Sequence, residues 1–373
     1  MPTLLLVLAS ICLAACSAPL NAQATPTTPI PMASEGQPQT IHLDVLVKDK
    51  RSGQPLSGLP EPAFTVKDNG QPQKLIGFKA VNANADPEAV HVLIVLDMIN
   101  IGAETVAWAR EQLGEYLKQE AGKLGYPTSI AAMNERGLRI MSGWTTDGNV
   151  LNAGLEKMQP DLRFLNRSGG WAARDELMET SVQQFSQILA AEQKIPGRKL
   201  VLFISPGWPM MPNQGAFEND KAARWCFNAD VALTNELRDD RTAIYDLDTY
   251  DLGNAHHDEG AQDPFYYEGF LKPVTRWSQS QFPDLAMGVF AIHSGGRVMV
   301  NGRRISAEIN DALRDAGSYY EITYAAPPAG DPNQYHAIDV RVSQPGATVQ
   351  TLAGYYADPQ PVSPRPKGKK KKH

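Results

Sequence analysis

The feature that most constrains the fold is a set of short, almost wholly apolar segments separated by longer stretches of helical periodicity. The apolar segments are residues 90–96, 199–204 and 242–247. An unbroken apolar run of this length is typical of a parallel strand that is covered on both faces. The intervening stretches supply the cover, because their apolar residues recur at helical spacing. The pattern therefore predicts a doubly wound α/β core, in which helices flank a mostly parallel sheet. We expect helices over residues 103–123, 147–158, 171–193, 219–237, 283–294 and 306–316.

Alternating segments at both ends of this core predict β-strands instead. Residues 41–85 contain three short strands joined by turn sequences, and residues 317–357 contain three more, separated by Pro and Gly. A unit of about 40 residues is too small to be stable alone, so we expect the first one to pack on the rest of the chain. The predicted organisation is a β lead-in (41–85), an α/β domain (88–316) and a β extension (317–357).

The N-terminus is predicted to be an export signal. Residues 1–15 carry no charge and include the apolar run 4–9, which is too short to span a bilayer. The signal ends at Leu13-Ala14-Ala15-Cys16, which resembles a bacterial lipobox and implies lipidation of Cys16. We expect a periplasmic, outer-membrane or cell-surface lipoprotein, held in the membrane by its N-terminal lipid. The alternative is a secreted protein cleaved after Ala24. Residues 16–40 are rich in Pro, Thr, Ala and Gln and predict a disordered linker.

The charge of the chain is unevenly distributed. Six of the 35 cationic residues lie in the last ten positions, which contain no acid. The rest of the chain therefore has 29 cationic and 41 acidic residues. An acidic body of about −12 argues against nucleic-acid binding, because no basic stripe is present to neutralise phosphates. The basic tail, 358–373, is expected to be disordered. It could contact an anionic lipid or polymer, or it could simply keep the chain soluble.

Four stretches in order along the chain resemble the acidobacterial VWFA-related family of exported proteins, whose core is a von Willebrand factor type A (VWA) domain. The stretches are residues 47–70, 95–100, 199–206 and 319–356. The resemblance implies a Rossmann-like VWA core with added β-strands at both ends. It also implies adhesion or assembly rather than catalysis, with a protein or an envelope polymer as the partner. Ligands of such α/β folds bind at the carboxyl ends of the parallel strands. For this chain, that edge is expected to present Asp97, Asn100, Ser205 and Trp208.

The family's magnesium site carries over only in part. A VWA site has Asp-x-Ser-x-Ser after the first core strand, and Asp97 stands at its first position. Ile99 and Ile101 replace the two serines, and Asn100 offers one amide oxygen. Because Mg²⁺ needs several well-placed oxygens, we expect a degenerate site and no cofactor. A simpler role for Asp97 is to cap the helix that follows it. A partner's Lys or Arg could also pair with Asp97 directly.

The remaining ligand positions leave alternatives open. Thr145, Thr146 and Ser168 are candidates for the family's threonine. Ser205-Pro206-Gly207 replaces its Thr-Asp-Gly, which removes the acidic ligand. If magnesium binds after all, we expect Asp97 and Asn100 to hold it together with Thr145 or Thr146.

Other polar clusters give weaker signals. The segment around His256 and His257 could bind Zn²⁺ or Ca²⁺, but its spacing matches neither an EF-hand nor a zincin and favours a solvated loop. An envelope hydrolase built on Ser205 or on this loop is a further alternative. No Gly-x-Ser-x-Gly elbow surrounds Ser205, so we expect no catalytic residues. Aromatic residues at 208 and 265–277 could contact a partner or pack onto the core. Cys226 is expected to be a small buried apolar residue.

Overall fold

The computed structural model describes residues 39–86, 89–100, 103–134, 136–141, 143–158, 170–205, 220–249, 264–299 and 304–357. Cys16, Ala24, Ser168, Trp208, the 256–257 histidine pair and the basic tail lie outside these residues, so the expectations for them remain predictions. Within the described ranges, no helix is both long and apolar enough to cross a membrane.

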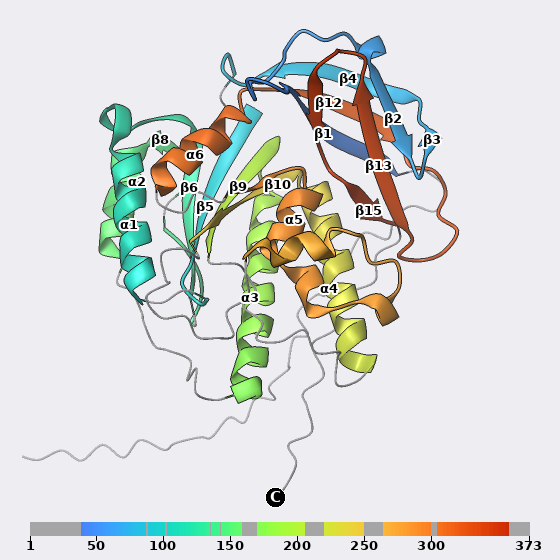
Figure 1. The fold of residues 1–373 in the computed structure, drawn as a ribbon. Helices are drawn as coiled ribbons and strands as arrows, with labels where there is room; N and C mark the ends of the chain where they lie inside the picture. The colour runs from blue at the N-terminus through green and yellow to red at the C-terminus, as the bar shows by residue number, and fades with distance from the viewer. Residues whose placement is uncertain are drawn as a thin grey trace, which may run out of the picture. The chain divides into compact units, whose positions relative to one another are not determined.

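A seven-stranded sheet forms the centre of the α/β part (Figure 1). Its order is β11-β10-β9-β5-β6-β7, with β8 also paired to β6; the first five strands are parallel, whereas β7 and β8 run antiparallel to β6. The sequence prediction of a mostly parallel, Rossmann-like sheet is therefore confirmed. The strands are β5 (Val90–Asp97), β6 (Lys123–Asn134), β7 (Gly137–Ile140), β8 (Thr145–Asp147), β9 (Arg198–Ser205), β10 (Thr242–Asp248) and β11 (Arg297–Met299).

Helices cover both faces of this sheet, and each face has its own apolar cluster. One cluster joins the sheet to α1 (Ala103–Leu117), α2 (Gly148–Lys157) and α6 (Ile305–Arg314). The other joins it to α3 (Gly170–Glu192), α4 (Asp220–Asp239) and α5 (Met287–His293). All eight residues of β5 and of β9 are buried, which explains their continuous apolar sequence. Short 3-10 helices complete the fold: η1 (Glu61–Ala63), η3 (Gln119–Gly122), η7 (Pro264–Phe270), η8 (Trp277–Gln279) and η9 (Phe282–Leu285).

Two helix predictions are corrected. The helix expected to reach residue 123 ends at Leu117, because Glu120, Ala121 and Gly122 all have positive φ and turn the chain directly into β6. The helix expected over 283–294 is divided into η9 and α5. Ala286 lies between them with an extended backbone, at φ −65° and ψ 141°.

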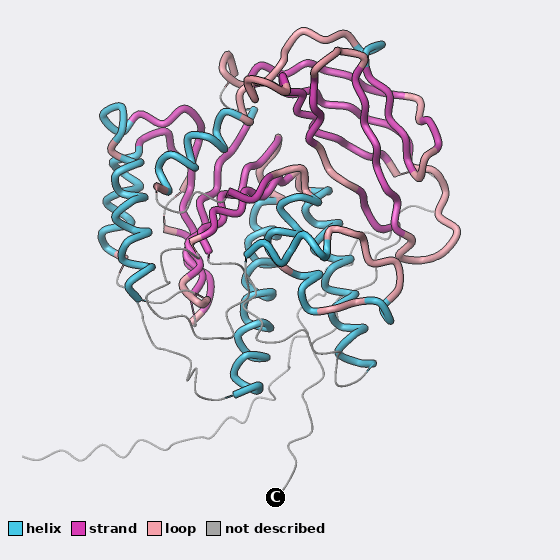
Figure 2. Tube along the Cα trace, in the orientation of Figure 1, coloured by secondary structure: helices cyan, strands magenta, loops and turns pink. Residues whose placement is uncertain are grey.

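Strands from both ends of the chain build one β-sandwich, which Figure 2 shows apart from the helices. Its first sheet has the order β14-β1-β12-β4 and its second the order β15-β13-β2-β3. Each sheet mixes strands from the lead-in and the extension, so each segment supplies the pairing partners of the other. The strands are β1 (Thr40–Asp49), β2 (Phe64–Asp68), β3 (Gln71–Pro72), β4 (Leu75–Asn82), β12 (Ser318–Ala325), β13 (Tyr335–Val342), β14 (Ala347–Gln350) and β15 (Gly354–Tyr356).

Strand β12 separates two cores. Because side chains alternate along a strand, Tyr320, Ile322 and Tyr324 enter the sandwich core. Tyr319 points to the other side and joins the apolar cluster beneath α1 and α6. The β-sandwich thus shares a buried surface with the α/β part.

Ionic contacts cross the same surface. The Asp315 carboxylate, 2% exposed in its side chain, accepts hydrogen bonds from Lys48 Nζ at 2.8 Å and from Arg297 Nε at 2.9 Å. Tyr245 donates a third, at 3.1 Å. Lys48 belongs to β1, whereas Arg297 and Tyr245 belong to β11 and β10. One carboxylate at the end of α6 therefore ties the sandwich to the central sheet.

Replacing Asp315 by alanine should destabilise the protein strongly. The change leaves two cations without their shared carboxylate, and breaking a buried ion pair from one side costs about 3–5 kcal/mol. Urea denaturation of the full chain measures the loss. Asp339→Ala is the matched control, because Asp339 pairs with Arg341 at the surface and its side chain is 45% exposed; we expect a change within about 0.5 kcal/mol. Equal losses in the two variants would contradict a structural role for the Asp315 contacts.

Asp230 of α4 is buried beside the hydroxyl of Tyr356, which lies within hydrogen-bond distance of two acceptors. The Tyr356 oxygen lies 2.9 Å from Asp230 Oδ2 and 2.8 Å from the carbonyl oxygen of Val274. A tyrosine hydroxyl has one proton, so it can donate to only one of these acceptors. If Asp230 is protonated, it donates to Tyr356, and Tyr356 donates to Val274. Burial raises the pKa of Asp230 to about 7, which agrees with this arrangement.

Stability should therefore fall as the pH rises from about 4 to 8. Burial also raises to about 7 the pKa values of four further acids, Glu192, Glu236, Asp240 and Asp284. Their unfolded values are about 4, so over this interval the folded state binds more protons and loses stability as they leave. Urea titrations at pH 5 and pH 8 measure the difference. Asp230→Asn, which mimics the protonated acid, should reduce it; stability that increases over this range would refute the assignment.

Candidate functional site

The candidate site lies where the order of the parallel strands reverses. Strand β6 follows β5 on one side, whereas β9 and then β10 are added on the other side. The switch point is therefore between β5 and β9, and in α/β folds the crevice at this point is where ligands bind. Asp97 is the last residue of β5 and Ser205 the last residue of β9. The structure brings these two side chains into contact.

Asp97 is saturated by hydrogen-bond donors. Its Oδ1 accepts from the backbone N–H groups of Ile99 at 3.0 Å and Asn100 at 3.1 Å. Its Oδ2 accepts from Asn100 Nδ2 at 2.8 Å and from the Ser205 hydroxyl at 2.9 Å. A carboxylate has about four acceptor sites, so these four donors occupy all of them. The arrangement joins the ends of the two central strands.

Burial of Asp97 is complete and affects its protonation. The side chain is 0% exposed, as is Ser205, and Asn100 is 6% exposed. Burial raises the pKa of the Asp97 carboxyl, while the donors from Asn100, Ser205 and Ile99 act in the opposite direction. The Asp97 carboxylate is enclosed and bonded within the chain, while its pairing with a partner's Lys or Arg stays a prediction.

The residues present do not fit a magnesium ion. All four acceptor sites of Asp97 already receive donors, and Asn100 turns its amide N–H₂, not its oxygen, toward the carboxylate. Ile99, which stands where a VWA domain has a serine ligand, packs in the apolar cluster against α3 and α4. Across the described ranges there is no group of three or more His, Cys, Asp or Glu side chains that could hold a metal ion.

Thr145 and Thr146 lie far from Asp97, so their predicted grouping with it is wrong. Thr145 pairs with Thr128 of β6, whereas Asp97 pairs with Met133. Five residues of extended chain separate these two levels, which is about 17 Å. The return of Thr145 toward the amino end of the sheet, on β8, was not predicted from the sequence.

The capping role of Asp97 also differs in detail. The first described residue of α1 is Ala103, six positions after Asp97, whereas the carboxylate receives the N–H groups of residues 99 and 100. Asp97 therefore closes the turn that leaves β5 and does not cap α1. Asp147, by contrast, is the N-cap of α2, as its sequence position predicted: its side chain accepts from the backbone N–H of Asn149.

Ser181 is a member of this network that the sequence did not reveal. It lies on α3, is 0% exposed, and its hydroxyl oxygen accepts a second hydrogen bond from Asn100 Nδ2 at 3.2 Å. The available signal was a small polar residue on an otherwise apolar helix face, beside Met178, Val182 and Phe185. That pattern indicates a buried serine but not its partner.

Similarity to known proteins is found among solved structures. No family's sequence profile matches the chain, and no curated protein matches it. Among solved structures, the human COPII-coat protein Sec24c is similar over 75% of this chain and 46% of its own, at 9% identity and a TM-score of 0.34. The conserved hypothetical protein BatB from Bacteroides thetaiotaomicron is similar over 43% of this chain and 66% of its own, at 14% identity and a TM-score of 0.23. The chain thus spans about half the length of Sec24c, and no functional property is transferred from either protein.

Magnesium should not stabilise the protein. A ligand that binds only the folded state raises Tm, by about 2.7 kcal/mol of stability at 100 times its Kd. We expect the same Tm in EDTA and in millimolar Mg²⁺, Mn²⁺ or Ca²⁺. Asp97→Ala should lower stability by about 3 kcal/mol in every condition, because it orphans buried donors. A Mg²⁺-dependent rise in Tm that vanishes in Asp97→Ala would establish a metal site instead.

Proposed function

We propose that this chain is a non-enzymatic binding protein of the cell envelope with a VWA-like α/β core. It binds a protein or an envelope polymer at the carboxyl edge of the central sheet, without a metal ion. The observation that supports the proposal is the pair of strand ends at the switch point, which Asp97, Asn100 and Ser205 hold together. These three buried residues position the edge; the chain segments that leave the edge make the contacts.

The lengths of the connections support this edge over the opposite one. Fourteen residues separate β9 from α4 and fifteen separate β10 from η7, and both connections leave the carboxyl edge. At the amino edge, five residues join α3 to β9 and two join α4 to β10. Connections beyond about 12 residues are uncommon in compact domains and usually carry function. Trp208, an amino-acid type that often anchors interfaces, belongs to the connection after β9.

The two alternative functions receive no support from the site. A metal-dependent adhesion module needs free oxygen ligands, and those of Asp97 are occupied. A hydrolase built on Ser205 needs an accessible nucleophile next to a base, whereas the Ser205 hydroxyl is 0% exposed and donates to Asp97.

Site-specific photo-crosslinking in intact cells tests the binding edge. A photoreactive residue at position 208 should yield a crosslinked protein, or crosslinked polymer, that persists in EDTA. The control position is Ile76 on β4 of the sandwich, which is 59% exposed. Crosslinks from position 76 alone would move the interface to the sandwich. Crosslinks from neither position would refute the proposed edge.

Fractionation of the same cells tests the envelope location. The native chain should sediment with membranes, and Cys16→Ser should release it, because one lipidated cysteine supplies the predicted anchor. A native chain found wholly in the cytosolic fraction would contradict an envelope role.

A further inference from the structure

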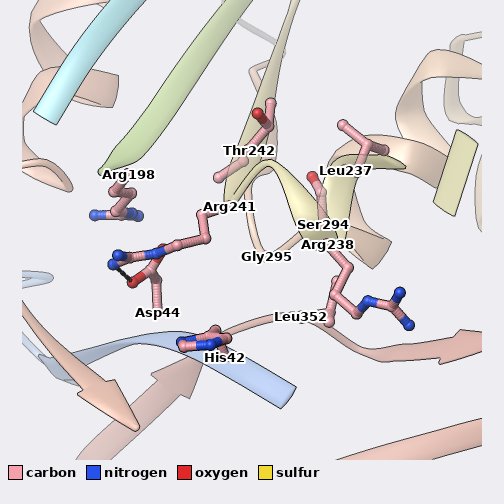
Figure 3. Close-up of a pocket in the computed structure, with 11 residues that line it drawn as sticks. His42, Asp44, Arg198, Leu237, Arg238, Arg241, Thr242, Ser294, Gly295 and Leu352 are labelled. Carbon is pink, nitrogen blue, oxygen red and sulfur yellow. Dashed lines mark hydrogen bonds and ion pairs between the residues drawn. The ribbon is translucent and has the colours of Figure 1, made fainter. Parts of the chain in front are cut away.

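A pocket separates the β-sandwich from the amino edge of the central sheet, on the side opposite the candidate site. Strand β1 forms one wall through His42 and Asp44, and Leu352 closes the same side. The other wall consists of Arg198 at the start of β9, the α4–β10 turn with Arg238, Arg241 and Thr242, and the end of α5 (Figure 3). The space holds about 340 Å³, including its opening to solvent.

Three buried polar atoms on these walls have no hydrogen-bond partner among the described residues. They are Arg198 Nε, Arg238 Nη1 and Thr242 Oγ1. Their residues are 2%, 5% and 3% exposed. Buried polar groups are nearly always paired, because an unpaired one retains its desolvation penalty. Two of the three atoms can only donate, and the threonine hydroxyl can donate as well. These three donors therefore lack acceptors.

The charges distinguish Arg198 from the other arginines. Arg241 pairs with Asp44 and Glu321, and Arg238 pairs with Asp239. In the part of the chain that the structure describes, Arg198 contacts no carboxylate: its Nη1 donates to the backbone oxygen of Asp315 at 2.8 Å, and its guanidinium lies 4.8 Å from the Tyr319 ring centre. A buried cation of this kind is costly unless an anion accompanies it.

Arg198 and Arg241 together give the geometry for such an anion. Figure 3 shows both guanidinium groups extending to the same side of the pocket, with Asp44 engaged by Arg241. The Asp44 carboxylate is the one acid in the lining and would repel an anion. Arg241 pairs with Asp44 and also with Glu321, so Arg198 is the lining cation that has no carboxylate partner among the described residues. Planar guanidinium groups bind phosphate oxygens with two parallel hydrogen bonds, which favours an oxyanion over a halide.

We propose that this pocket binds a small soluble oxyanion, inorganic phosphate or a phosphate ester, with Arg198 as its principal ligand. Because Arg198 is 2% exposed between two packed layers, a headgroup fixed in a bilayer cannot reach it. The site is independent of the proposed partner-binding edge. It would make the junction between the sandwich and the α/β part sensitive to the anion.

Titration of the full chain with sodium phosphate tests the proposal, with sodium chloride at matched ionic strength as the baseline. Isothermal calorimetry should give a saturable phosphate signal, and Tm should rise in parallel. Arg198→Met, which keeps the length and apolar bulk of the side chain, should abolish both responses. Arg341→Met is the control, because Arg341 is on β13 of the sandwich with its side chain 72% exposed, and should respond like the native chain.

Arg198→Lys covers the case in which Arg198→Met does not fold. Lysine keeps the charge but loses the planar donor pair, so phosphate should bind about tenfold more weakly or worse. A native chain that does not bind phosphate would overturn the proposal. So would an Arg198→Lys or Arg198→Met variant that binds phosphate as tightly as the native chain. A purely structural Arg198 would lower Tm equally with and without phosphate.

Discussion

The carboxylate of Asp315 is the contact on which the relation between the two parts of the chain depends. It receives Lys48 from the first strand of the sandwich and Arg297 from the last strand of the central sheet, while its backbone oxygen receives Arg198. A single anion between two cations, buried where solvent screens it little, holds both layers in one orientation. Burial of the apolar surface around Tyr319 stabilises the packing of the sandwich on the α/β part, but it does not fix their orientation. The ionic contacts fix the orientation, because Lys48 and Arg297 reach the Asp315 carboxylate from different strands.

Local patterns in the sequence predicted the elements of the fold well. The continuous apolar run of β5 indicates a strand that is covered on both faces, and the alternation in β1 indicates a strand with one face in a core. Pairing between strands was not predictable in the same way. Nothing near Val45 indicates that its partner is Tyr320, because the pairing is decided by the sandwich core, which forms only when the lead-in and the extension meet. The lead-in and the extension therefore looked like two units from the sequence, although they share both sheets.

At the candidate site, too, some features could be predicted from short sequence motifs, whereas others depend on contacts between distant segments. The contact between Asp97 and Ser205 follows from a general rule, because carboxyl ends of neighbouring parallel strands meet at one edge. The isoleucine at position 99 already indicated that a metal would lack a ligand. The place of Thr145 and the contribution of Ser181 depend on a hairpin register and on the rotation of α3, which no short motif encodes. The burial of the site could not be predicted from the sequence either. Asp97, Asn100 and Ser205, which were expected at the partner-binding edge, are buried and hold the strand ends together.

The interleaved sandwich has a consequence for how the chain is made. Val45 of β1 pairs with Tyr320 of β12, so 275 residues must be synthesised before that partner exists. At about 5–20 residues per second, β1 waits for roughly 15–55 s as an unpaired apolar strand. The α/β core has mostly closer neighbours along the chain and can assemble during that time. Strand β1, the first strand that the structure describes, is therefore among the last to pair, and it needs protection from other nascent chains while it waits.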